Sequence, residues 1–463
     1  MEGLVGRVTA TWRRTVDVGW PVAVQQAVNT LMRTVDVLVV GLFSPAAVAA
    51  IGLGDLFSRV PFWLGKGFGS GAIALASQET GRGSDVNRDR AITQALVVGA
   101  LAGVPLVAVG FLFGRELLGL LGADPEVARL GGYYLTIIFA VAPVRIVAMV
   151  AARALQGTGD TRTPMYVGVS ATVLNVVLSL ALGLGLWVAP TLGIVGVGLA
   201  TAISRVLEAV LLVAAIASPR TAPSLSWSTN PTIARQLFAV SLPDIAGGLS
   251  GEVANVPFNA ILLLFGTEVT AAYHIANRLY QQFTAPLFRA FRTVESIFVG
   301  QALGAGRPDE ARFLAGAVCA LSVLTLVVAG VLLFLGARPL STLFTRDPTT
   351  IGYAASFVRT FAVSMAFIGV YFPLTGALRG AGDTRTPFYA RLLGSYVFLL
   401  GTSYLLAVTL DFGLVGVFVG IVLSYLARAV VVGWVVVRGE WVSLAERLIT
   451  ERAEPGEGSP QRE

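Results

Sequence analysis

The ten residues from Leu155 to Pro164 read LQGTGDTRTP, and the ten from Leu378 to Pro387 read LRGAGDTRTP. Eight of the ten positions are identical between the two copies. Each copy has the residues of a tight connection, because Gly adopts positive φ, Asp bonds to nearby backbone, and Pro suits the first turn of a helix. Long apolar segments lie on both sides of each copy. The motif therefore predicts a short polar corner between two helices.

The two corners are 223 residues apart, and the same separation relates Gln78 to Gln301 and Gly81 to Gly304. A repeat that divides the chain near its middle indicates two homologous halves.

The composition indicates an integral membrane protein. Mean hydropathy is +0.76, and charged residues make up 13% of the chain, against about 25% in soluble domains. Residues 1–15 lack the apolar core of a cleavable signal, so we expect the first span to act as the targeting signal. The isoelectric point of about 9.7 reflects arginines that are concentrated in loops on one side of the membrane, which is a signal of topology. No nucleic-acid partner is therefore expected. The single cysteine, Cys319, excludes an intrachain disulfide and gives no support to metal or redox chemistry.

A hydrocarbon core of about 30 Å requires about 20 apolar residues per helix. Twelve stretches meet this length, six in each half. Their expected ranges are 15–40, 46–78, 89–113, 128–153, 164–187, 191–217, 235–264, 268–299, 308–335, 351–377, 387–409 and 413–437. The fold class is therefore all-α, with twelve transmembrane helices in two parallel six-helix repeats.

An even number of spans places both termini on one side of the membrane. Fourteen arginines fall on that side, between Arg7 and Arg438, whereas the opposite loops offer four, namely Arg115, Arg129, Arg338 and Arg346. The excess predicts cytoplasmic termini in a cell membrane protein. The expected division is an N-terminal lobe at 1–217, a cytoplasmic linker at 218–234, a C-terminal lobe at 235–437 and a cytoplasmic tail at 438–463.

Ionisable and polar side chains inside membrane spans are candidates for function because their burial in hydrocarbon is costly. Asp36 lies in the first span, and Asn175, Ser179 and Thr201 in the fifth and sixth could face it. A carboxylate with amide and hydroxyl oxygens suits a proton or Na⁺ site, and Asp36, Asn175 and Thr201 are the candidate Na⁺ ligands. The alternative is ordinary hydrogen bonding between helices.

Glu252, Asn255 and Asn259 share one face of the seventh span. This polar stripe predicts either a substrate cleft or an interhelical hydrogen-bond cluster. Asp55 and Arg278 occupy equivalent positions of the second and eighth spans, which suggests an ion pair between the halves, acting as a gate or as a static bridge.

A group of charged residues at three-residue spacing lies near the end of the eighth span: Arg289, Arg292 and Glu295. We expect it to form a solvated or headgroup-facing surface.

No enzyme site is apparent, since the chain has neither a GxxxxGK[ST] phosphate-binding loop nor a cluster of His and Cys. The chain is therefore expected to be no enzyme, to use no cofactor, and to draw any transport energy from an ion gradient.

The duplicated LxGxGDTxTP corners, Asp36 followed by VLVVGLFSPAAVAA, and the pairs Gln78-Glu79 and Gln301-Ala302 resemble the multidrug and toxic compound extrusion (MATE) family of the MOP flippase superfamily. The resemblance covers about residues 15 to 437. It implies a V-shaped, two-lobe transporter that exports amphipathic, often cationic compounds by alternating access, in exchange for H⁺ or Na⁺. Its partners would be small molecules and membrane lipid, with no obligatory protein partner.

The resemblance also implies roles for particular residues. Asp36 would couple the ion, with Asn175 and Thr201 beside it, whereas Ser179 stands where one branch carries a second Asp. Glu252 matches the seventh-span acid of the NorM-type branch. The substrate cleft would then combine a polar stripe and nearby aromatic rings, namely Glu252, Asn255, Asn259, Tyr273, Phe283 and Phe288.

The alternative function is a flippase for lipid-linked oligosaccharide or cell-envelope precursors. Its anionic substrate would require a cleft with several cations, for which Arg278, Arg289 and Arg292 are the candidates.

Overall fold

The computed structural model of the chain describes the backbone of residues 2–186 and 190–453, with the side chains of these residues except 2 and 33–38. The described ranges contain helices and no strand, which confirms the all-α class.

The described residues of the first half form seven α-helices and a short π-helix. They are α1 (Glu2–Gly41), α2 (Pro45–Arg82), α3 (Asp85–Gly119), α4 (Pro125–Ala140), α5 (Ala142–Gly157), α6 (Arg162–Leu178), η1 (Ser179–Gly183) and α7 (Gly193–Ile216).

The second half has the same order of spans, with its second span divided at Thr284 and its fourth span unbroken, and it adds a helix at its end. Its elements are α8 (Pro231–Leu263), α9 (Thr267–Phe283), α10 (Ala285–Gly304), α11 (Pro308–Ser341), α12 (Pro348–Gly380), α13 (Arg385–Leu392), η2 (Leu393–Thr402), η3 (Leu405–Thr409), α14 (Leu414–Arg438) and α15 (Glu440–Arg452).

Each of the twelve expected spans coincides with one helix or a short series of helices. The fourth span is broken at Val141, where α4 and α5 meet at an angle of 49°. In the described part of the chain, eight helices are long and apolar enough to cross a membrane, or nine if this bent pair is one span. The prediction of spans from apolar length therefore found the helices but not the breaks within them.

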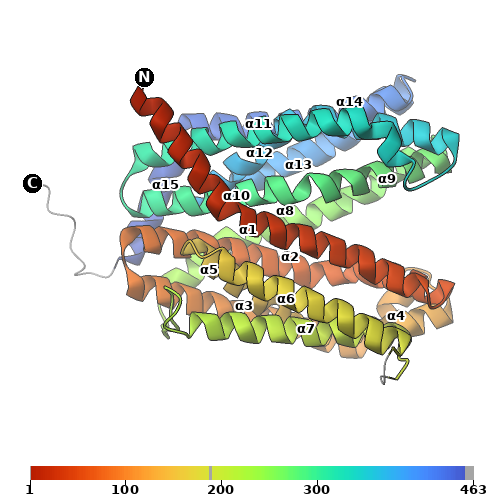
Figure 1. The fold of residues 1–463 in the computed structure, drawn as a ribbon, viewed down its shortest axis with the longest axis horizontal. Helices are drawn as coiled ribbons and strands as arrows, with labels where there is room; N and C mark the ends of the chain where they lie inside the picture. Colours follow the sequence, from red (N-terminus) through yellow and green to blue (C-terminus); the bar gives the residue numbers. More distant parts are fainter. Residues whose placement is uncertain (1, 187–189, 454–463) are drawn as a thin grey trace, which may run out of the picture.

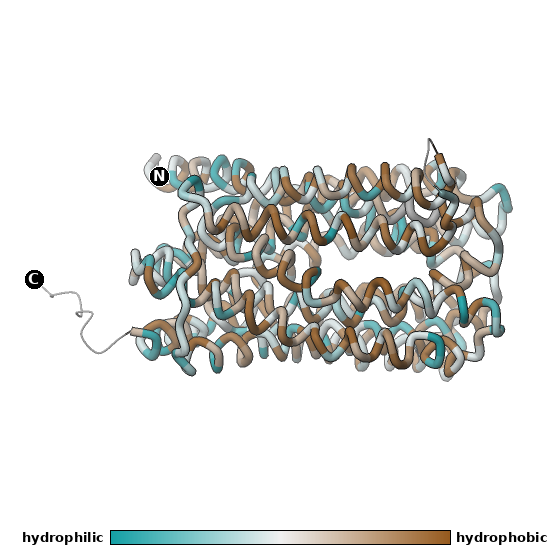
Figure 2. The backbone as a smooth tube through the Cα atoms, turned by 90° about the horizontal axis from the view of Figure 1, so that it is seen from below, coloured by the Kyte–Doolittle hydropathy of each residue, from teal (hydrophilic) through white to brown (hydrophobic). Residues whose placement is uncertain are grey.

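The helices of the two halves form two groups that lie side by side (Figure 1). Helix α1 begins and α15 ends at the same end of the bundle, which we call the terminal face. Hydrophilic segments gather toward the ends of the bundle, and hydrophobic residues follow the helices between them (Figure 2). Leu101, Phe111 and Leu332 are among the large apolar side chains exposed on the outside. Such a surface is typical of helices that contact lipid.

Both corner motifs adopt the predicted local structure. Gly159 and Gly382 have φ of 100° and 89°, the left-handed conformation that glycine adopts without strain. Asp160 accepts hydrogen bonds from the backbone N–H groups two and three residues ahead, at 3.1 and 2.9 Å. Asp383 accepts one from the N–H three residues ahead at 3.0 Å. The carboxylates thus satisfy N–H groups that would otherwise lack partners at the start of the next helix.

The two halves meet where α2 crosses α10 near the terminal face. A Cβ atom added at Gly81 would lie 2.0 Å from the carbonyl oxygen of Gln301, and one added at Gly304 would lie 1.9 Å from that of Gln78. The repeat relates these two contacts to each other. Only glycine allows the backbones to approach this closely, as at many helix contacts in membranes.

The same glutamines connect each half to the corner of the other. Gln78 Nε2 donates a hydrogen bond to the carbonyl oxygen of Gly380 at 2.8 Å, and Gln301 Nε2 donates one to that of Gly157 at 3.2 Å. The corner motifs that reveal the duplication therefore also form part of the contact between the halves.

The crossing predicts that Gly304→Ala destabilises the protein, because the added methyl group forces the two backbones apart. Overpacking of this kind costs about 1–3 kcal/mol. Gly316→Ala on α11 is the control, since nothing lies within 4 Å of an added Cβ there, and Ala favours helix by up to about 1 kcal/mol. Thermal unfolding in detergent should give a lower Tm for Gly304→Ala alone; an unchanged Tm would show that the crossing tolerates a side chain.

Candidate functional site

A buried polar group lies between α6 and α7 in the first half. Asn175 is 0% exposed, and its Nδ2 donates hydrogen bonds to Thr201 Oγ1 at 3.3 Å and to Ser204 Oγ at 3.2 Å. The structure thus brings Asn175 and Thr201 together. Ser179, one turn after Asn175, begins the π-helix η1, a widening that is frequent at functional sites.

Two oxygens of this group have no hydrogen-bond partner among the described residues: Asn175 Oδ1 and the hydroxyl oxygen of Ser179. Buried acceptors without donors are costly, and amide and hydroxyl oxygens are suitable ligands for a hard cation. No group of three or more His, Cys, Asp and Glu that could hold a metal occurs among the described side chains. Asp36 lies in α1, and its side chain is outside the described residues.

A second polar group crosses the seam between the halves. Asp244 of α8 accepts a hydrogen bond from the Ser70 hydroxyl of α2 at 2.5 Å and forms an ion pair with Arg379 of α12. Both partners of this pair are buried, at 6% and 4% exposure. Arg153 of α5 donates to the Thr293 hydroxyl of α10 at 2.8 Å.

Sequence reasoning missed Asp244, Arg153 and Arg379, although each is an ionisable residue within an expected span or at its end. The rule that intramembrane charges are functional candidates applies to them as it does to Asp36. The expectation of a solvated surface at Arg292 and Glu295 was wrong, because these side chains are 6% and 0% exposed. They lie on faces of α10 that other helices cover.

The expected gate residues do not pair. Asp55 accepts a hydrogen bond from the Ser58 hydroxyl at 3.2 Å, Arg278 is exposed, and no ion pair joins them among the described side chains. An ion pair between the halves exists one helical turn away, where Arg59 Nη1 lies 2.5 Å from Glu252 Oε2. The seventh-span acid thus lies on the seam.

The other expected cleft residues are dispersed. Asn255 is exposed, and its carbonyl oxygen accepts a hydrogen bond from Asn259 Nδ2 at 2.8 Å. Tyr273 and Phe288 belong to an aromatic group inside the second half. Tyr273 packs edge-on against Phe258 and Phe357, with ring centroids 5.2 and 5.5 Å apart. Phe288 lies 4.0 Å from Phe372 by the same measure. Phe283 is 53% exposed.

A third polar group lies on the seam at the terminal face and involves the last helix, α15. Arg452 of α15 is buried and donates through Nε to Glu79 Oε1 at 2.7 Å, and through Nη2 to Gln78 Oε1 at 2.6 Å. Its Nη1 donates to Gln236 Oε1 of α8. One guanidinium thus bonds to α2 of the first half and α8 of the second. Burial lowers the pKa of Arg452 from its ordinary value, and the Glu79 carboxylate opposes that shift.

Comparison with known proteins identifies the family. The family model described as MatE matches residues 21–181 and 254–405, one segment in each half. The chain belongs to the MATE family.

Similar proteins cover nearly the whole chain. A "Probable multidrug resistance protein NorM" of Rhodopseudomonas palustris is 29% identical over 446 residues, 92% of each chain. A protein of the same name from Bradyrhizobium diazoefficiens is 30% identical over 424 residues, 88% of this chain and 89% of the relative.

A solved structure described as an outward-facing multidrug resistance MATE family transporter of the MOP superfamily has a TM-score of 0.86 at 22% identity, covering 93% of this chain and 96% of that chain. The expected twelve-helix, two-lobe fold of a MATE transporter is confirmed. We refer to the two halves as lobes from here on.

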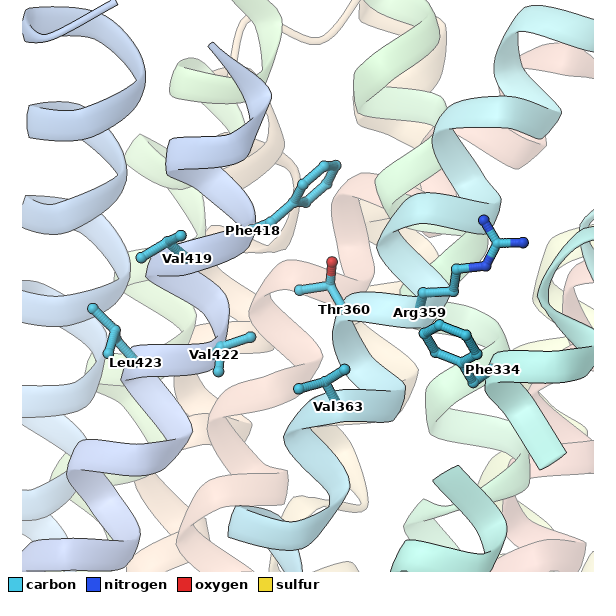
Figure 3. Close-up of a pocket in the computed structure, with 8 residues that line it drawn as sticks. All are labelled: Phe334, Arg359, Thr360, Val363, Phe418, Val419, Val422 and Leu423. Atoms are coloured by element: carbon cyan, nitrogen blue, oxygen red, sulfur yellow. The ribbon is translucent and has the colours of Figure 1, made fainter. Parts of the chain in front are cut away.

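A hollow in the second lobe of this MATE protein is lined by none of the residues of the three polar groups (Figure 3). The Arg359 guanidinium lies over the Phe334 ring, 5.6 Å from its centroid. The lining is otherwise mostly aliphatic, as expected of a surface that contacts lipid. The lining residues come from α11, α12 and α14: Phe334, Arg359, Thr360, Val363, Phe418, Val419, Val422 and Leu423.

Arg452→Ala is expected to destabilise the protein because it leaves the Glu79 carboxylate buried beside the seam. Removing one partner of a buried ion pair costs about 3–5 kcal/mol. The loss of unfolding free energy should fall at the lower end of this range, because Arg82 still lies near the Glu79 carboxylate, with its Nη1 3.7 Å from Glu79 Oε2. The measurement is Tm in detergent, with Arg447→Ala at an exposed position of α15 as the control.

The double variant Arg452→Ala with Glu79→Gln should recover part of the lost stability, because no uncompensated charge is then buried. Equal Tm values for Arg452→Ala and Arg447→Ala would refute a stabilising role for this contact.

Proposed function

We propose that this chain is a secondary active multidrug efflux transporter that exports amphipathic compounds, cationic ones among them, in exchange for H⁺ or Na⁺. The two most similar relatives reported above are named multidrug resistance proteins, which supports the class of substrate. The observation that carries the mechanism is the pair of buried polar groups, one inside the first lobe and one across the seam. The first group has oxygens that could bind an ion. The second contains hydrogen bonds between the lobes, which change when one lobe moves against the other.

The proposed transport cycle is alternating access. Contacts at the terminal face, Gln78 to Gly380, Gln301 to Gly157 and Arg452 to Glu79, hold the lobes together at that end. With the arginine-rich segments placed in the cytoplasm, this arrangement is closed to the cytoplasm. Opening toward the cytoplasm then requires these contacts to break while others form. The protein would act in the plasma membrane as a single chain, without an enzymatic step or a cofactor other than the coupling ion.

Ion coupling would act through the first lobe. A proton or Na⁺ on Asp36, with Asn175, Ser179 and Thr201 as neighbours, would change the packing of α1 against α6 and α7. An ion shifts the equilibrium between two conformations only if it binds one of them better. The unpartnered oxygens of Asn175 and Ser179 are the groups that such an ion could contact in one conformation and lose in the other.

A flippase for an anionic lipid-linked precursor is the second candidate. The observation that favours it is the position of Arg289 and Arg292 on α10, from which the Arg289 side chain reaches Gln26 of the first lobe at 3.4 Å.

The deciding experiment is ethidium or norfloxacin export from proteoliposomes under a pH gradient or a Na⁺ gradient, each imposed alone. Export under one gradient would establish the exporter and identify its coupling ion. Absence of export under both gradients would refute the proposal and favour the lipid flippase.

Asp36→Asn should reduce gradient-driven export at least about tenfold, because an amide cannot take up the proton or supply the charge that holds Na⁺. The matched control is Asp411→Asn at an exposed connection, where φ is 57° and Asn tolerates the backbone conformation. Export is followed by ethidium fluorescence, and correct folding by the elution profile in detergent. Full export by Asp36→Asn would refute the coupling role.

A further inference from the structure

Basic side chains gather on the seam between the lobes, from Lys66 midway along α2 to Arg379 near the end of α12. Each lies within electrostatic range of at least one other, and they come from α2 and α5 of the first lobe and from α10, α12 and α13 of the second. We call this set the central cationic cluster. It consists of Lys66, Arg153, Arg289, Arg292, Arg379 and Arg391.

The acidic side chains around the cluster do not balance its charge. Among the described residues, Asp244 is the carboxylate that interacts with the cluster closely, and it is paired with Arg379. Glu252 also acts on Arg391 and is itself bound to Arg59. Glu295 lies on the side of α10 that meets Gly376 and Cys319. Among the described side chains, six cations thus share the charge of Asp244 and part of that of Glu252.

Several contacts of the cluster are with neutral groups. Arg153 donates to the Gln156 and Thr293 side chains, and Arg289 reaches two glutamine side-chain oxygens at 3.2 and 3.4 Å. The Nε of Arg379, a side chain with 4% exposure, has no hydrogen-bond partner. Burying cations without counter-charges is unfavourable in a membrane. The arrangement therefore offers charge and donors beyond what the fold itself uses.

Aromatic rings adjoin these charges. The Lys66 ammonium lies 4.0 Å from the centroid of the Trp63 ring, and the Arg391 guanidinium lies 5.7 Å from the same ring. The Arg292 guanidinium lies 5.7 Å from the centroid of Phe372. The cluster thus combines positive charge with apolar surface, the two features that an amphipathic anion requires.

The depth of Lys66 suits a transport site. Lys66 is sixteen residues before the end of α2 at Arg82, which corresponds to about 24 Å from the terminal face at the rise of an α-helix. Substrate sites of alternating-access transporters lie near the middle of the membrane, between the repeats.

We infer that the central cationic cluster binds the anionic group of the substrate, a carboxylate, sulfonate or phosphate, while the apolar part lies against Trp63 and Phe372. Guanidinium groups suit these anions because they present paired donors in a plane. The substrate class that follows is an amphipathic anion, in contrast to the cationic compounds expected from the family resemblance. This inference rests on the proposed transport function and specifies its substrate.

The test uses three probes in proteoliposomes under the pH and Na⁺ gradients: carboxyfluorescein as a soluble anion, ethidium as a cation, and NBD-labelled phosphatidylglycerol as an anionic lipid. Binding of carboxyfluorescein to the detergent-solubilised protein is measured separately by fluorescence anisotropy. The variants are Lys66→Gln and Arg289→Gln, with Lys66→Arg to restore the charge and Arg346→Gln in an exposed loop as the control.

We expect the wild type to bind carboxyfluorescein, with affinity about tenfold lower in Lys66→Gln and in Arg289→Gln, the loss typical of one charge-assisted hydrogen bond. Lys66→Arg should restore most of the affinity, and Arg346→Gln should match the wild type in carboxyfluorescein binding and in ethidium export. A fold defect would also lower Tm, whereas loss of an anion site would not.

The outcomes separate this inference from the proposed function. Ethidium export without binding or export of carboxyfluorescein would overturn the inference and leave the exporter intact. Carboxyfluorescein binding that depends on Lys66, without export of any soluble probe, would support the inference and refute the exporter. Movement of the labelled lipid alone, weakened in Lys66→Gln, would assign the anionic group to a lipid headgroup. Absence of carboxyfluorescein binding and of lipid movement overturns the inference in every case.

Discussion

The close crossing of α2 and α10 is the contact on which the relation between the two lobes depends. Gly81 and Gly304 let each helix approach the backbone of the other so closely that a Cβ atom would meet a carbonyl oxygen at about 2 Å. At this distance the side chains of Gln78 and Gln301 reach the corners of the opposite lobe. Helices in lipid associate through such packing and hydrogen bonding rather than through the hydrophobic effect. The crossing therefore determines where every other residue of the seam can lie.

The duplication explains the paired corners and the crossing, and the differences between the repeats explain the polar groups. Glu79 corresponds to Ala302 in the second half, so the acid that bonds to Arg452 has no counterpart there. Asn175 corresponds to Phe398, and only the first lobe has the buried amide with its hydroxyl neighbours. The residues that the repeats share build the corners and the crossing. The residues that they do not share carry the charge and the unpartnered oxygens.

The sequence alone predicts much of the fold, because the corners, the repeat and the apolar lengths are local or periodic signals. The sequence also indicates that Asn175 could contact Thr201, since both are polar residues in neighbouring apolar helices. It does not indicate which residues pair across the seam. Asp244 meets Ser70 and Arg379, 174 and 135 residues away along the chain, and Arg452 meets Glu79 at a separation of 373. No periodicity indicates which charges pair across such separations. The prediction that Tyr273 and Phe288 line the cleft rests on their aromatic character, and aromatic side chains are equally suited to packing inside a lobe.

The strengths of the seam contacts indicate how the lobes could separate. Asp244 and Arg379 both belong to the second lobe, so this buried ion pair would move as a unit and need not break. Two contacts that do cross the seam there, Ser70 to Asp244 and Arg153 to Thr293, are hydrogen bonds of neutral hydroxyl groups with charged side chains. Each such bond contributes about 1.5–3 kcal/mol, and water that enters an opening seam can replace it.

The exception is the ion pair of Arg452 with Glu79. Its two side chains are 1% and 0% exposed, and their separation would leave a carboxylate of the first lobe facing the terminal side alone. Water at that face can hydrate both charges once they separate. The charges of an ion pair at mid-membrane depth would lack this hydration. Among the described residues, the fully buried ion pair between the lobes thus lies at the end where solvent can take over the role of each partner, and the other ion pair between them, Arg59 with Glu252, is partly exposed. The contacts that cross at the centre are ones that can break at lower cost.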